Sequence, residues 1–167
     1  MGRFCRTLAA VAAIVFIASV PTTLTLAQDT AQQSQPLGRA DLYPNVTMEI
    51  KKLERLPRLN VVELRFDVLN SRQAALSAEF LQFLTLGSDG KYTVANIGLV
   101  DFSNSVRYHP AESQGTMSSR IPHGSSLAAG ARWSFWVWFS APPQGVTKLA
   151  VYVPGVPPIL DVSLGGP

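Results

Sequence analysis

Residues 59–69 read LNVVELRFDVL, and this stretch decides the class of fold. Its even positions from 62 to 68 are all apolar, and its odd positions from 63 to 67 are all charged. A period of two places the apolar side chains on one face of the chain, which is the pattern of a half-buried β-strand. A second strong stretch, RWSFWVWF at residues 132–139, has large apolar side chains on both faces. The two stretches together predict a β-sheet.

Shorter strand-like stretches recur through the rest of the chain. Residues 97–102 and 106–108 flank the turn sequence Ser103-Asn104-Ser105 and predict a hairpin. Residues 78–86, AEFLQFLTL, fit a short helix or a strand, and the Gly-Ser-Asp-Gly that follows favours a strand. Further strands are expected at 46–53, 148–153 and 159–164. After residue 27, no stretch keeps an apolar period of 3.6 over three turns, so we expect an all-β sandwich of about 7–9 strands over residues 45–164.

The first 27 residues predict a secretory signal peptide. Arg3 and Arg6 precede the apolar run LAAVAAIVFIASV at residues 8–20, and small residues lead up to Ala27. Cleavage after Ala27 is expected, followed by a disordered polar spacer at 28–44. The alternative is an uncleaved anchor, because residues 8–26 carry no charge and nearly reach the length of a membrane span. We favour cleavage, and therefore expect a secreted or periplasmic protein with no stable membrane anchor.

The charge balance excludes strong electrostatic partners. The chain has 14 basic and 11 acidic residues, and two of the basic residues belong to the predicted signal. The remainder is therefore close to neutral, which gives no field suited to nucleic acid. The only cysteine, Cys5, also lies in the predicted signal, so we expect no disulfide.

Residues for catalysis or metal binding are sparse. The chain has two histidines, His109 and His123, each beside a proline, and their spacing does not match a metal-ligand pattern. The sequence Pro122-His123-Gly124-Ser125-Ser126 lacks the strand-to-helix context of a nucleophilic serine. The acids at positions 49, 54, 63 and 67 are interpreted as a solvated sheet face. We therefore expect no catalytic residue, no metal site, no cofactor and no enzymatic activity.

The aromatic strand is the best candidate for a binding surface. Trp133, Phe135, Val137 and Phe139 are assigned to the core face, which leaves Trp136 and Trp138 on the opposite face. Either loops cover these two rings, which we favour, or the rings are exposed and available for stacking on a sugar or packing on a protein. Trp136 and Trp138 are candidate binding residues, and Tyr108 and His109 are two more.

Several short motifs follow one another in the second half of the chain. They include Leu99-Val100-Asp101, Tyr108-His109-Pro110, Leu127-Ala128-Ala129-Gly130, Trp138-Phe139-Ser140-Ala141-Pro142-Pro143 and Val153-Pro154-Gly155. In this order they resemble secreted bacterial immunoglobulin-like domains of unknown function, including domains that precede peptidoglycan-binding outer-membrane-type domains. The resemblance covers about residues 45–164 and implies an immunoglobulin-like fold and an envelope location, but no reaction.

Three functions remain open from the sequence. The first is a non-enzymatic interaction module of the bacterial cell envelope with a protein partner. The second is a carbohydrate- or peptidoglycan-binding module that uses exposed aromatic residues on a cell-wall polysaccharide. The third, and least favoured, is an enzyme with a loop site in residues 108–126. Exposed aromatics beside polar side chains favour the second function, and a bare apolar strip favours the first.

Overall fold

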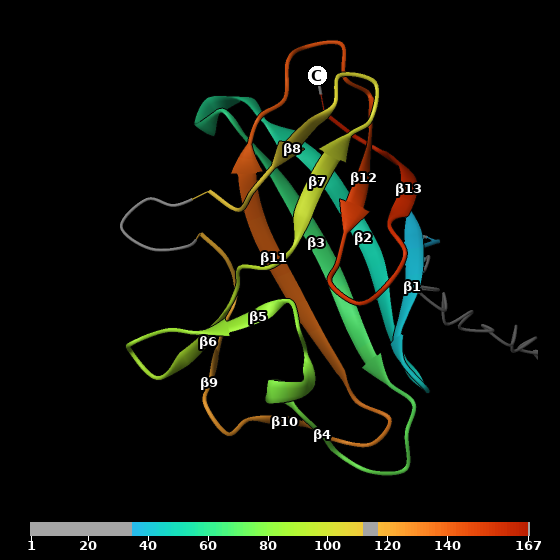
Figure 1. Cartoon of the computed structure of the whole chain (residues 1–167), viewed down its shortest axis with the longest axis vertical. Coiled ribbons are helices and arrows are strands. Elements are labelled where there is room, and N and C mark those ends of the chain that lie inside the picture. The colour runs from blue at the N-terminus through green and yellow to red at the C-terminus, as the bar shows by residue number, and fades with distance from the viewer. Residues whose placement is uncertain (1–34, 112–116, 167) are drawn as a thin grey trace, which may run out of the picture. The chain divides into compact units, whose positions relative to one another are not determined.

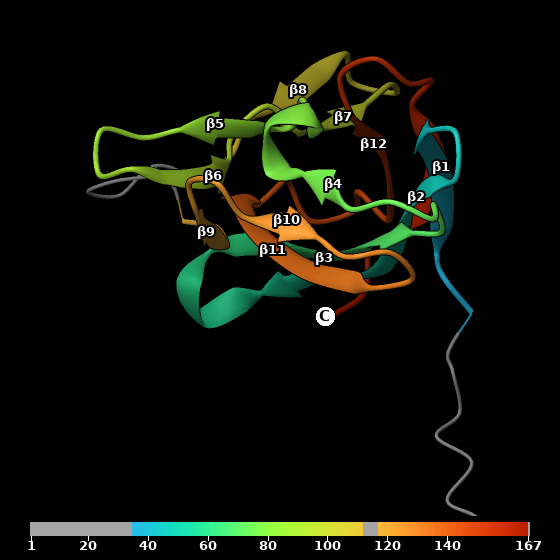
Figure 2. The same ribbon diagram turned by 90° about the horizontal axis from the view of Figure 1, so that it is seen from below.

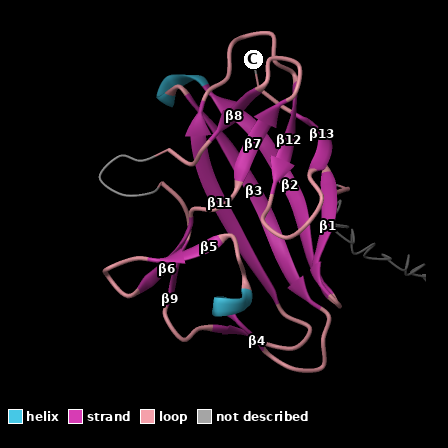
Figure 3. Cartoon of the chain, viewed as in Figure 1, coloured by secondary structure: helices cyan, strands magenta, loops and turns pink. Residues whose placement is uncertain are grey.

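The fold is all-β, as the sequence predicts. The computed structural model describes residues 35–111 and 117–166, so the predicted signal peptide lies outside the described residues. Within them, helical structure is limited to two 3-10 turns, η1 (Pro57–Leu59) and η2 (Ala78–Phe80), and strands account for most of the rest (Figure 3). Among these residues, no helix has both the length and the apolar character needed to cross a membrane.

The first large sheet contains the two stretches that decide the fold. Its order is β1 (Gly38–Tyr43), β2 (Val46–Leu56), β3 (Val61–Asn70) and β11 (Arg132–Ser140), and every pairing is antiparallel. The register between β3 and β11 is unbroken from Val61↔Ser140 to Leu69↔Arg132. The register between β2 and β3 shifts between Ile50 and Lys52. One extra residue in β2 allows Ile50 and Leu53 both to face the core.

The second large sheet packs against the first over a shared core (Figure 1, Figure 2). Its order is β13 (Ile159–Ser163), β12 (Lys148–Tyr152), β7 (Gly98–Asp101) and β8 (Val106–Tyr108), again antiparallel. The predicted hairpin is confirmed as β7 and β8. Leu99, Val151 and Val162 point from this sheet into the core.

The centre of the core is aromatic. Phe135 of β11 stacks on Phe66 of β3, with ring centroids 5.2 Å apart. Phe83 meets both rings edge-on, with centroids 5.4 Å away in each case. The prediction that Phe135, Val137 and Phe139 face the core is confirmed, since all three are buried. Trp133, assigned to the same face, is only partly buried and packs edge-on against Phe135.

Five short strands form two smaller sheets at one end of the molecule (Figure 1). One sheet is β5 (Leu84–Leu86), β6 (Lys91–Val94) and β9 (Arg120–Pro122), and the other is β4 (Leu76–Ser77) and β10 (Ser126–Leu127). The described residues thus form 13 strands, more than the 7–9 expected. Alternation over two to four residues is too short to be recognised in a sequence.

Two boundaries differ from the sequence analysis. The folded domain begins before residue 45, because Gly38–Tyr43 of the predicted disordered spacer form β1. These residues pair with β2 and cover core residues that would otherwise be exposed. The predicted strand over 78–86 is also wrong in its first part, where η2 precedes the short β5. Phe83 points into the core and sets the path of this segment.

Candidate functional site

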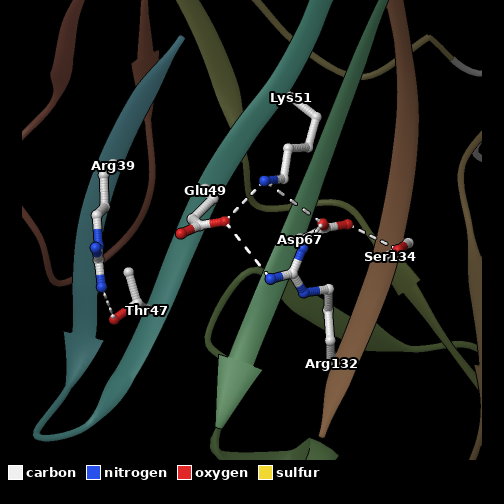
Figure 4. Close-up of polar contacts among 7 residues, drawn as sticks. All are labelled: Arg39, Thr47, Glu49, Lys51, Asp67, Arg132 and Ser134. Carbon is white, nitrogen blue, oxygen red and sulfur yellow. Dashed lines mark hydrogen bonds and ion pairs between the residues drawn. The ribbon is translucent and has the colours of Figure 1, made fainter. Parts of the chain in front are cut away.

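The outer face of the first sheet carries a network of ion pairs (Figure 4). Asp67 of β3 accepts hydrogen bonds from Arg132 at 2.9 Å and from Ser134 at 2.7 Å, both on β11. Lys51 of β2 donates to Glu49 at 2.8 Å and lies 4.0 Å from Asp67. Antiparallel pairing sets these side chains next to one another across three strands.

Two acidic side chains on this face are buried and not solvated. Asp67 is 8% exposed and Glu63 is 6% exposed, so the interpretation of these acids as solvated is wrong. Glu63 accepts from Arg65 Nε at 2.6 Å and from Trp138 Nε1 at 2.9 Å. Burial acts to raise the pKa of Glu63, but these two hydrogen bonds and the positive charges of Arg65 and Lys52 together outweigh it and lower the pKa. Hydrogen bonding from Lys51 likewise lowers the pKa of Glu49.

Trp136 and Trp138 lie side by side on the same face, and we call them the tryptophan pair. Their ring centroids are 5.5 Å apart and their planes are inclined by 52°. Trp136 is 36% exposed, whereas Trp138 is half-buried and bonded to Glu63. The expectation that loops cover both rings is therefore wrong for Trp136.

Described loop residues near the tryptophan pair bond to the edge of β11. Trp138 accepts a backbone hydrogen bond from Ala111 at 2.7 Å and donates one to Met117 at 2.9 Å. Ser119 donates to the Trp136 carbonyl at 2.8 Å. These contacts satisfy backbone groups that an edge strand would otherwise expose.

A groove of about 620 Å³ runs over the outer face of the second sheet, and we call it the hairpin groove. Val100 of β7 and Ala150 of β12, which are paired in register, are among its lining residues. Three large apolar side chains line it and remain exposed to solvent: Phe102 at 63%, Leu160 at 59% and Val106 at 39%. Its ion pair, Lys148 with Asp161 at 3.8 Å, joins β12 to β13.

Polar contacts fix both sides of the hairpin groove. On one side, the buried carboxylate of Asp101 accepts from the backbone of Ser103 and from the backbone and side chain of Asn104, at 2.7–3.1 Å. These bonds hold the turn between β7 and β8, and the bond from the Asn104 side chain contributes most to lowering the pKa of Asp101.

On the other side, Arg55 of β2 holds the loop at residues 142–146. Its guanidinium donates to the carbonyls of Pro142 at 2.6 Å, Pro143 at 2.7 Å and Val146 at 3.1 Å. A planar guanidinium with several donors suits such a cluster of carbonyl oxygens. The connection between β11 and β12, which contains this loop, supplies residues 143–147 to the groove lining.

The structure does not bring the four predicted binding residues into one site. Tyr108 lines the hairpin groove, and burial raises the pKa of its phenol. His109 follows it as an exposed residue. The tryptophan pair belongs to the outer face of the other large sheet. Sequence reasoning missed Phe102 and Leu160, although an apolar Phe102 beside the turn sequence Ser103-Asn104-Ser105 was a usable signal.

The region proposed for a loop enzyme lies partly outside the described residues. Of residues 108–126, positions 112–116 are not described. His123 Nε2 lies 3.5 Å from Glu79 Oε1, and its ring lies 5.7 Å from that of Tyr92. In the described part of the chain, no group of three or more potential metal-binding side chains gathers.

Comparison with known proteins finds no relative of this chain. The chain matches no family model, no curated protein and no solved structure.

Proposed function

We propose that this chain is an exported, non-enzymatic interaction module of the bacterial cell envelope that binds a partner protein through the hairpin groove. The observation that carries the proposal is the convergence of Phe102, Val106 and Leu160, all exposed, on one groove. Soluble proteins rarely leave neighbouring large apolar side chains uncovered unless the surface binds something. Phe102 and Leu160 are therefore the expected anchor residues.

The two sides of the groove are held in place before binding, and this rigidity favours tight binding of an apolar surface. Asp101 and Arg55 hold the two sides in place, so that binding costs little conformational entropy. Lys148 and Asp161 already pair with each other, and their charges balance. The partner is accordingly expected to present an uncharged, apolar segment, with little dependence of its affinity on salt.

The experiment is a pull-down from the envelope fraction with the mature protein and with a Phe102→Ser, Leu160→Ser double variant. The matched control is Phe80→Ser with Leu86→Ser, because these side chains are 60% and 48% exposed and are not part of the groove lining. The proposal expects the groove variant to lose a specific partner that the control retains, with similar melting temperatures for both. Equal capture by the two variants would contradict it.

Export is part of the proposal and has its own test. It rests on the predicted signal peptide at residues 1–27, with cleavage after Ala27. Mass spectrometry of the extracytoplasmic fraction is expected to find Gln28 at the new N-terminus. An intact N-terminus in the membrane pellet would support an uncleaved anchor instead.

We also propose an immunoglobulin-like architecture at the level of its layers. Two antiparallel four-stranded sheets over one core support it. The strand order differs, because β3 stays beside β1 and β2, whereas the third strand of an immunoglobulin domain crosses to the other sheet. The proposed likeness is therefore one of architecture and not of connectivity, and an experimental structure would test it.

A further inference from the structure

The tryptophan pair has polar neighbours that the proposed groove function does not use. Across the ladder between β3 and β11, Arg65 is opposite Trp136 and Glu63 is opposite Trp138. Arg65 contacts Glu63 through Nε, and the Arg65 side chain is 58% exposed. In the described part of the chain, its two terminal nitrogens make no hydrogen bond and are available there as donors beside Trp136.

This combination of groups matches the chemistry of a sugar. A pyranose ring has an apolar face of C–H groups and a rim of hydroxyls. The exposed ring of Trp136 supplies a flat apolar surface for the C–H face. Arg65 supplies donors for the hydroxyl oxygens, and the buried Glu63 carboxylate positions Arg65 and Trp138 through the hydrogen bonds that it accepts from them.

The charges on this face favour a neutral ligand. Glu63 pairs with Arg65 at 2.6 Å, and Glu54, opposite Glu63 in the register, pairs with Lys52 at 2.5 Å. Each acid beside the tryptophan pair therefore has its own cation, which leaves no excess charge to attract a phosphate or a polyanion. An apolar protein segment would fit poorly, because it would cover the charged groups without replacing their contacts with water.

The surface is also rigid before any ligand arrives. Trp138 is held by its bond to Glu63, and the backbone of β11 is bonded to β3 on one side and to residues 111, 117 and 119 on the other. A fixed aromatic surface loses little entropy on binding. We propose that the tryptophan pair and Arg65, held in position by Glu63, form a second binding site, independent of the hairpin groove, for a neutral glycan that stacks on Trp136.

The test uses the mature protein with insoluble chitin, a neutral polysaccharide, and with a panel of soluble neutral oligosaccharides, followed by co-sedimentation and by tryptophan fluorescence. Trp136→Ala is expected to weaken binding about 30-fold, the change that corresponds to a hot spot of 2 kcal/mol. Trp136→Phe is expected to restore part of the affinity, because a smaller aromatic face remains. Arg65→Met is expected to weaken binding without abolishing it, because the stacking surface stays.

The controls separate this site from the groove. The Phe102→Ser, Leu160→Ser variant is expected to bind glycan as the unchanged protein does, whatever becomes of its protein partner. Melting temperatures of the Trp136 variants show whether they remain folded. Failure of every glycan to bind, or equal binding by Trp136→Ala, overturns the proposal. Loss of a protein partner with Trp136→Ala, in the absence of glycan binding, also overturns it and makes this face a protein interface.

Discussion

Replacing Phe135 with alanine tests the whole account of the core. Phe135 is 4% exposed and lies in contact with three aromatic rings. It stacks on Phe66 at 5.2 Å, meets Phe83 edge-on at 5.4 Å and meets Trp133 at 6.3 Å. The substitution removes a phenyl group between two sheets that are fixed by their own hydrogen-bond ladders, so the structure has little freedom to close the cavity.

The expected cost follows from these contacts. A buried Phe→Ala change costs about 3–5 kcal/mol, and we expect the upper half of this range because three aromatic contacts are lost together. A domain of this size has a total stability of about 5–15 kcal/mol, so the variant loses a large part of it. Trp136→Ala is the matched control on the same strand. Because Trp136 is 36% exposed and faces away from the core, we expect it to cost less than half as much.

Urea unfolding followed by circular dichroism measures both variants. The midpoint is expected to fall for Phe135→Ala with an unchanged dependence on urea concentration, since the same surface is exposed on unfolding. A loss for Phe135→Ala that is no larger than that for Trp136→Ala would refute the assignment of the two faces of β11.

Three further changes probe the contacts that hold the loops and the charged face. Asn70 is fully buried, and its side-chain amide donates to the carbonyls of residues 74, 127 and 128. Asn70→Ala is therefore expected to lower the free energy of unfolding, measured in urea, by about 1–3 kcal/mol. Asn70→Asp is expected to lower it more, because a carboxylate would face three carbonyl oxygens. Arg55→Met is expected to increase hydrogen exchange at residues 144–147 and to weaken partner binding at the groove, while backbone amides in β3 stay protected. The pKa of Glu63 in the folded protein lies below its ordinary value of 4.5, so its contribution to stability is present above that pH and is lost as the pH falls through the lower folded value. When melting temperatures are measured from pH 7 to pH 2, they are therefore expected to decrease once the pH is below about 4.5, and to decrease less steeply in Glu63→Gln. An equally steep decrease in both proteins would contradict the role of Glu63.

Part of the candidate site could be predicted from the sequence. Alternation along residues 132–139 assigned Trp136 and Trp138 to the face away from the core, because side-chain direction in a strand depends on sequence position alone. Exposure could not be predicted in this way. Glu63 and Asp67 have the alternation of solvated residues, yet they are buried by Trp138 and Arg132, which come from a strand about 70 positions later in the chain.

The hairpin groove, too, could be predicted only in part from the sequence. The hairpin of β7 and β8 was predicted, because two short apolar runs around a turn sequence carry enough local information. The convergence of Phe102 with Leu160 was not, since nothing near either residue specifies that β12 lies between their strands. The contacts of Arg55 with the loop at 142–146 likewise join residues far apart in the sequence.

By itself, the sequence of this protein determined the all-β class, the main strands and the core face of β11. These properties depend on the period of apolar residues and on turn chemistry, which act over a few neighbouring positions. Only the tertiary structure decided which strands pair, that residues 38–43 join the first sheet, and which side chains meet in the groove and beside the tryptophan pair. These depend on contacts between distant segments, where the free energy of packing outweighs local preference.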